Sequence, residues 1–179
     1  MTGEAPFDLH VAEGVGAAAA GAGKRHGVWP LKKGAKYSGH YNKAMNIDDI
    51  AESFEMLDDW EARYALLLDL GKKLEPLPDE AHTDINKVRG CMSQVWMDHQ
   101  LNDGALHFRG DSDAHIVRGL IALLFAMVQD RKPQEILALD IPGTFAQLGL
   151  ENHISMNRRN GFYAMTERIK GMAQAAAEG

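Results

Sequence analysis

The stretch S-Q-V-W-M-D-H-Q-L-N-D-G-A-L-H-F-R-G, residues 93–110, decides the fold class of this chain. Apolar and polar side chains alternate in residues 93–99 and again in residues 105–110, which is the pattern of half-buried β-strands. The N-D-G segment between the two runs has turn chemistry. The stretch therefore predicts a β-hairpin with a loop of about five residues, and this loop length leaves the strand register open.

The sequence before the hairpin predicts two helices and a loop. Apolar residues recur at helical spacing from Ile47, and a second apolar face starts at Trp60, where Asp58 or Asp59 can cap the helix. Two prolines end this helix pair. The following segment, residues 79–92, has no sustained periodicity and predicts a loop that leads into the first strand.

The sequence after the hairpin predicts helices to its end. Ser112 or Asp113 can cap the first of them, which carries a continuous apolar stripe from Ile116. Shorter helices follow, and Ser155 can cap the last one. The pattern as a whole predicts an α+β domain in which a small antiparallel sheet is covered on one face by helices.

Composition divides the chain near residue 45. The net charge of -6 splits into +3 over residues 1–44 and -9 over residues 45–179. The first part is rich in Gly and Ala without periodicity, so we expect a disordered or weakly ordered N-terminal extension. The second part holds every periodic segment and predicts one domain.

Charge and hydropathy also narrow the functional class. The acidic body argues against nucleic acid as the main ligand, because phosphates would be repelled. The best apolar run, residues 119–128, has about half the length that a membrane span needs. No secretory signal is visible, so we expect a cytoplasmic protein that binds no membrane.

Cys91 is the only cysteine of the chain. A lone thiol excludes an intramolecular disulfide and any site built from several thiolates. Gly90 precedes it and allows close backbone approach. Lys87 and Arg89 are near in sequence, and their charges would favour the reactive thiolate if they face the sulfur. The alternative is a thiol that packs inward as a small hydrophobe, and spacing alone does not decide between the two.

Other chemistries have weaker support. His99, His107 and His115 follow Cys91, but no tight spacing of metal ligands connects them, so we expect no metal site. A cysteine hydrolase would need a base and an oxyanion hole, and no local signature supports either.

Four segments, in order along the chain, resemble the SufE family of sulfur acceptors. They are the opening I-D-D-I-A-E-S-F-E-M-L-D-D-W-E-A-R-Y (47–64), N-K-V-R-G-C-M-S-Q-V-W (86–96), F-R-G-D-S-D-A-H-I-V-R-G-L-I-A-L-L (108–124) and R-x-N-G-x-x-x-M (158–165). The resemblance covers about residues 45–175. It implies the helix-covered sheet described above, which SufE proteins share with IscU-type scaffolds.

The resemblance also implies a function. Cys91 matches the cysteine that accepts sulfur, as a persulfide, from a SufS-type cysteine desulfurase and passes it to an iron–sulfur scaffold complex. Arg158 matches a motif arginine near that cysteine or the partner surface, and Asp113 matches an aspartate close to the cysteine loop. Pyridoxal phosphate belongs to the desulfurase, so we expect no cofactor in this chain.

The resemblance further implies that the protein acts as an accessory of a desulfurase rather than as an independent enzyme. How it does so, and its oligomeric state, stay open at the level of sequence. It could do so by carrying sulfur or, alternatively, as an allosteric module that activates the desulfurase without taking sulfur. We expect a monomer or a weak homodimer.

Overall fold

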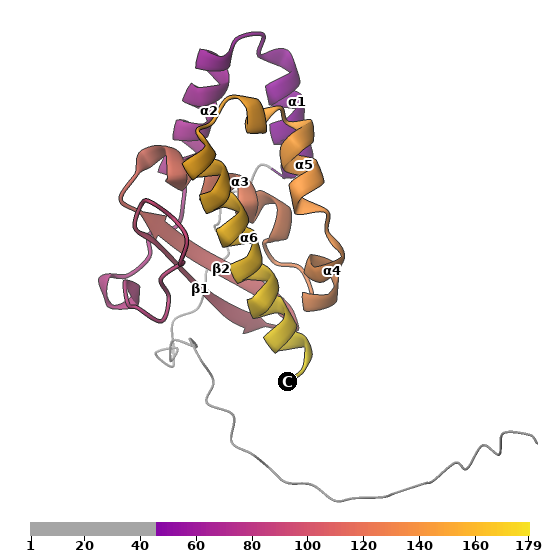
Figure 1. The fold of residues 1–179 in the computed structure, drawn as a ribbon. Helices are drawn as coiled ribbons and strands as arrows, with labels where there is room; N and C mark the ends of the chain where they lie inside the picture. The colour runs from indigo at the N-terminus through magenta and orange to yellow at the C-terminus, as the bar shows by residue number, and fades with distance from the viewer. Residues whose placement is uncertain (1–45) are drawn as a thin grey trace, which may run out of the picture.

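The structure is a computed structural model that describes residues 46–179, so the extension predicted for residues 1–44 lies outside the described residues (Figure 1). The elements, in order, are α1 (Ile47–Met56), α2 (Trp60–Lys72), the 3-10 helix η1 (Asp79–Ala81), β1 (Val95–Asn102), β2 (Ala105–Ser112), α3 (His115–Val128), α4 (Pro133–Ala138), α5 (Ile141–Gln147), η2 (Leu150–Asn152) and α6 (Met156–Ala177). The two strands form one antiparallel sheet. This arrangement confirms the predicted α+β class.

The β-hairpin is tighter than the sequence suggested. Asn102 pairs with Ala105, so only Asp103 and Gly104 form the turn. Both have positive φ, 50° and 81°, as the two central residues of a type I′ turn do. The expected loop of about five residues was therefore wrong, because both strands continue to the turn and the turn itself sets the register.

One face of the hairpin carries the core. Met97 and Phe108 are fully buried on it, and the ring of Phe108 stacks on Phe125 of α3 with centroids 6.0 Å apart. Figure 1 shows α6 running obliquely across the sheet, with the α1–α2 pair beyond its upper end. The apolar alternation of the strands therefore faces the helices, as predicted.

The opposite face of the hairpin is polar and is also covered. Asp98 and Arg109 form a buried ion pair of 2.6 Å between facing strand positions. The ring of Trp96 contacts His82, which lies in the segment before β1, with centroids 4.7 Å apart. Asp98 and Arg109 thus satisfy each other's charge, whereas Oε1 of Gln100 on the same face is buried without a hydrogen-bond partner among the described residues.

Helices α2 and α3 meet at very close range through glycine. A Cβ atom placed on Gly119 would lie 2.3 Å from the backbone oxygen of Leu67, and one placed on Gly71 would lie 2.7 Å from the backbone nitrogen of Gly119. Both distances are far below van der Waals contact. Only glycine lets the two backbones approach this closely, and the contact makes α3 the centre of the helical layer.

The predicted caps form in part, since Ser155 occupies the cap position of α6 but its side chain makes no capping hydrogen bond. Asp59 caps α2 by accepting from the amide of Ala62, as expected. Helix α3 begins at His115 with Ala114 in the cap position, and neither Ser112 nor Asp113 caps it. The prediction for α3 was wrong because Asp113 uses its carboxylate elsewhere, at the site described next.

Candidate functional site

Cys91 lies on a short loop, residues 89–94, that we call the cysteine loop. Lys87 forms an antiparallel bridge to β1 just before it, and a backbone hydrogen bond of 2.9 Å from Val88 N to Val95 O closes it. The loop is thus the tip of a small hairpin rather than a free connection.

The thiol of Cys91 points toward helix α6. Its Sγ donates a hydrogen bond to the backbone oxygen of Gly161 over 3.6 Å. Cys91 is half-buried, and this burial raises the pKa of its thiol. In this inward position burial favours the neutral thiol over the thiolate, which is the opposite of the effect expected if Lys87 and Arg89 faced the sulfur.

Small residues on α6 make room for the cysteine loop. A Cβ atom on Gly161 would lie 3.4 Å from Sγ of Cys91. One turn further along, Ala164 faces Gly90, where an added Cβ would lie 3.4 Å from the Ala164 methyl group. Gly90 has φ 90°, a conformation that favours glycine.

A second contact holds the far end of the cysteine loop. The amide of Gln94 donates to the carboxylate of Asp113 over 3.0 Å, and the amide of Asp113 donates to the backbone oxygen of Gln94 over 3.3 Å. Asp113 therefore joins the loop to the start of α3 instead of capping that helix. This position agrees with the closeness to the cysteine loop that the family resemblance implied.

A pocket of about 330 Å³ opens beside the thiol. Its buried wall consists of apolar side chains from α3 and α6, and its exposed rim is polar and comes from the start of α6. These residues are Val117, Leu120 and Met165 on the wall, and Ser155, Asn157 and Arg158 on the rim. Cys91 thus lies between an apolar interior and a rim that carries one positive charge.

The structure brings some of the predicted site residues together and not others. Cys91 and Arg158 line the same pocket, and Gly90 lies beside them in the loop. Lys87 is half-buried in the base of the loop, while Arg89 is exposed at its start. Sequence reasoning missed Gly161, although a glycine inside a strongly helical stretch is a signal for close packing.

Metal binding finds no support in the described residues. His99 pairs with Phe108 and His107 with Gln100, so the two imidazoles are on opposite faces of the hairpin. Within residues 46–179, no group of three His, Cys, Asp or Glu side chains is arranged to hold a metal ion. The same part of the chain contains no helix that is long and apolar enough to span a bilayer.

Fold and site together define a small α+β protein that presents one thiol on a short loop above a pocket. The sequence profile of the SufE family, described as an Fe-S metabolism associated domain, matches residues 48–173. The chain therefore belongs to the SufE family, whose domain is associated with iron–sulfur metabolism.

Relatives agree with this assignment. The chain is 42% identical over 133 residues to an uncharacterised SufE-like protein of Rhizobium meliloti, covering 72% of this chain and 95% of the relative. It is 43% identical over 136 residues to one of Rhizobium etli, covering 74% and 92%. Its fold resembles the solution structure of a hypothetical protein from Thermus thermophilus, with a TM-score of 0.64, 21% identity and coverage of 76% and 98%.

Proposed function

We propose that this protein accepts sulfane sulfur on Cys91 from a SufS-type cysteine desulfurase and passes it on for iron–sulfur cluster assembly. Membership of the SufE family supports this function at the level of the pathway. The observation that carries the proposal is the placement of Cys91, on a short loop, against a pocket, with one weak hydrogen bond to α6.

The reaction is an exchange between two sulfur atoms. The thiol of Cys91 first loses its proton, and the thiolate attacks the outer sulfur of the desulfurase persulfide. A new bond forms between Sγ and that outer sulfur, the sulfur–sulfur bond of the desulfurase breaks, and the desulfurase cysteine leaves as a thiolate. No net oxidation occurs, because the sulfane sulfur only changes its carrier.

Movement of the cysteine loop supplies the change in reactivity. Burial raises the pKa of Cys91 in the inward position, so the resting thiol is a poor nucleophile. When the loop turns outward that burial is lost, and the thiol ionises more readily beside the partner. The return of Cys91 to the pocket would shelter the persulfide from free thiols and oxidants.

Basic residues near the loop are candidates to stabilise the developing thiolate. Arg158 lines the pocket that contains Cys91, which makes it the first choice. Arg89 is exposed next to the loop tip, and Lys87 lies in the base of the loop. A positive charge at these positions favours an anionic sulfur over a neutral one.

The test is desulfurase turnover with the wild type and with Cys91→Ser, followed by mass analysis of the acceptor. We expect the wild type to stimulate turnover and to gain one sulfur atom on Cys91. Cys91→Ser should lose the stimulation while its thermal unfolding midpoint stays close to that of the wild type. Ser93→Ala, which alters the same pocket without touching the thiol, is the matched control.

The experiment also separates carriage of sulfur from activation alone. Full stimulation by Cys91→Ser, with no sulfur added to the wild type, would contradict the acceptor function. That result would support a module that activates the desulfurase by binding.

A further inference from the structure

Helix α6 contains two glycines that differ in their surroundings. An added Cβ on Gly161 would contact Sγ of Cys91 at 3.4 Å and its Cβ at 3.9 Å. An added Cβ on Gly171 would find no atom within 4 Å. Glycine lowers helix stability at either position. Of the two, only Gly161 faces another group, which is the thiol of Cys91.

The orientation of Gly161 is held by its neighbours. Phe162 is fully buried and stacks on Phe145 of α5, with centroids 4.0 Å apart. Met165, one turn along, is buried in the pocket wall. The helix therefore cannot rotate about its axis without breaking its own core, and the Gly161 backbone is a fixed surface for the thiol.

The Gly161 carbonyl oxygen can accept a hydrogen from a thiol but not from a thiolate. Within a helix this oxygen is already directed along the helix axis, and a sulfhydryl group is a weak additional donor. A thiolate at the same position would instead place a negative charge near the negative end of a carbonyl dipole. The contact therefore favours the neutral, inward thiol.

We propose that Gly161 is a positioning residue that keeps the resting thiol of Cys91 turned inward, because its carbonyl accepts the thiol hydrogen and Sγ lies where a side chain longer than a methyl group would extend. Gly90 and Ala164 extend the same surface by one turn. A methyl group at position 161 would meet Sγ at van der Waals distance, whereas a larger side chain would push the sulfur away from the helix and toward solvent.

This inference deepens the proposed function, since an inward thiol matters most if Cys91 carries sulfur. It does not share its test. Alkylation of the full-length protein by iodoacetamide involves no desulfurase, so the positioning role and the acceptor function succeed or fail separately.

The experiment compares the alkylation rate of Cys91 in Gly161→Leu and Gly161→Ala with the rates in Gly171→Leu and Gly171→Ala. We expect Gly161→Leu to raise the rate at least about threefold, because the displaced thiol is more exposed and ionises more readily. Gly161→Ala should stay close to the wild type, because its methyl group meets Sγ at van der Waals distance. Both Gly171 variants should stay within about 1.5-fold of the wild type, because their side chains point to open space.

The pH profile of alkylation distinguishes positioning from a loss of stability. Displacement from the carbonyl should move the midpoint of the profile to lower pH in Gly161→Leu, whereas general loosening of the fold would raise the rate without that change. A rate in Gly161→Leu equal to or below that of the wild type would overturn the proposal. If Gly161→Leu does not fold, the same criterion applies to Gly161→Val, whose side chain also exceeds a methyl group.

Discussion

Two helix surfaces in this protein use glycine to admit another segment, and they differ in how closely that segment approaches. At Gly119 of α3, an added Cβ would lie 2.3 Å from the backbone of Leu67. At Gly161 of α6, it would lie 3.4 Å from the thiol of Cys91. The first contact joins two backbones, whereas the second joins a backbone to the end of a side chain.

The difference indicates what each contact is for. Backbones packed between buried helices cannot separate without opening the core, so the α2–α3 contact is rigid. The cysteine loop rests on α6 through one weak hydrogen bond and van der Waals contact, so less holds it against α6 than holds α2 against α3. Glycine thus serves a close backbone contact at Gly119 and a looser side-chain contact at Gly161.

The largest expected effect comes from Gly119→Ala, which would disrupt the rigid contact between α2 and α3. The added methyl group collides with the backbone of α2, so we expect the free energy of unfolding to fall by about 3 kcal/mol or more. Urea denaturation monitored by circular dichroism measures this change.

Gly171→Ala is the matched control for Gly119→Ala. It places the same methyl group in open space, so it should raise stability by about 0.5 to 1 kcal/mol through helix propensity alone. Equal effects of the two substitutions would show that the close approach of α2 and α3 does not limit stability.

A smaller effect is expected at Met92, which lies in the cysteine loop. Met92 follows Cys91 and is 79% exposed. Under the proposed function, the partner surface that delivers sulfur to Cys91 would contact this exposed side chain. We expect Met92→Gln to raise by roughly fivefold the protein concentration that gives half-maximal stimulation of the desulfurase. Maximal stimulation and stability should stay unchanged.

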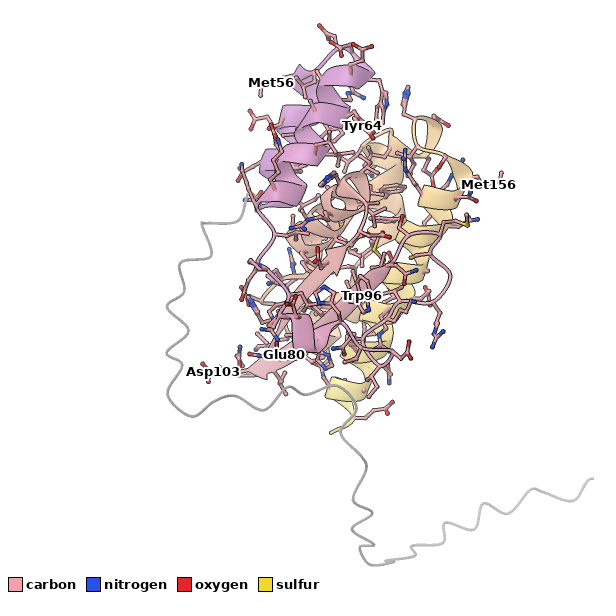
Figure 2. All side chains as sticks on the ribbon, turned by 90° about the vertical axis from the view of Figure 1, so that its left-hand side faces the viewer. Met56, Tyr64, Glu80, Trp96, Asp103 and Met156 are labelled. Carbon is pink, nitrogen blue, oxygen red and sulfur yellow. The ribbon has the colours of Figure 1, made fainter. Side chains whose placement is uncertain are left out.

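Met56→Gln serves as the control for Met92→Gln. Met56 is 69% exposed at the outer end of α1, and Figure 2 shows it well away from Trp96 in β1. It should leave the stimulation curve where it is. A fall in stability with Met92→Gln would instead assign the side chain to the fold.

The smallest expected effect is a pH dependence that belongs to the rigid body. His107 of β2 is buried and bonds to Glu75 and Asp130, and these bonds, led by that to Glu75, raise its pKa. A group whose pKa is raised on folding contributes its full stabilisation at pH values below its pKa in the unfolded chain. This stabilisation is lost as pH rises through its pKa in the folded protein.

His107→Gln should therefore change the pH dependence of stability without changing the reactivity of Cys91. As pH rises from the ordinary titration range of histidine through the raised pKa of His107, the wild type should lose stability that the variant does not lose. The alkylation profile of Cys91 should be the same in both proteins. A change in that profile would mean that the polar cluster and the cysteine loop are coupled.

Much of the fold could be predicted because the evidence for it is local. Alternation in residues 93–110 indicated the hairpin, and Asp59 was a correct cap because a side chain two or three residues from an amide has few other partners. Asp113 shows the limit of this reasoning. Its sequence context fits a helix cap, but its carboxylate binds Gln94, which only the folded chain brings near.

The sequence by itself determined the α+β class, the uniqueness of Cys91 and its place before a strand, since periodicity, turn residues and composition are properties of neighbouring positions. Only the tertiary structure decided that the thiol faces Gly161, that burial raises its pKa and that Arg158 shares its pocket. The physical reason is that α6 and the cysteine loop are far apart along the chain, and their contact depends on how the core orients α6.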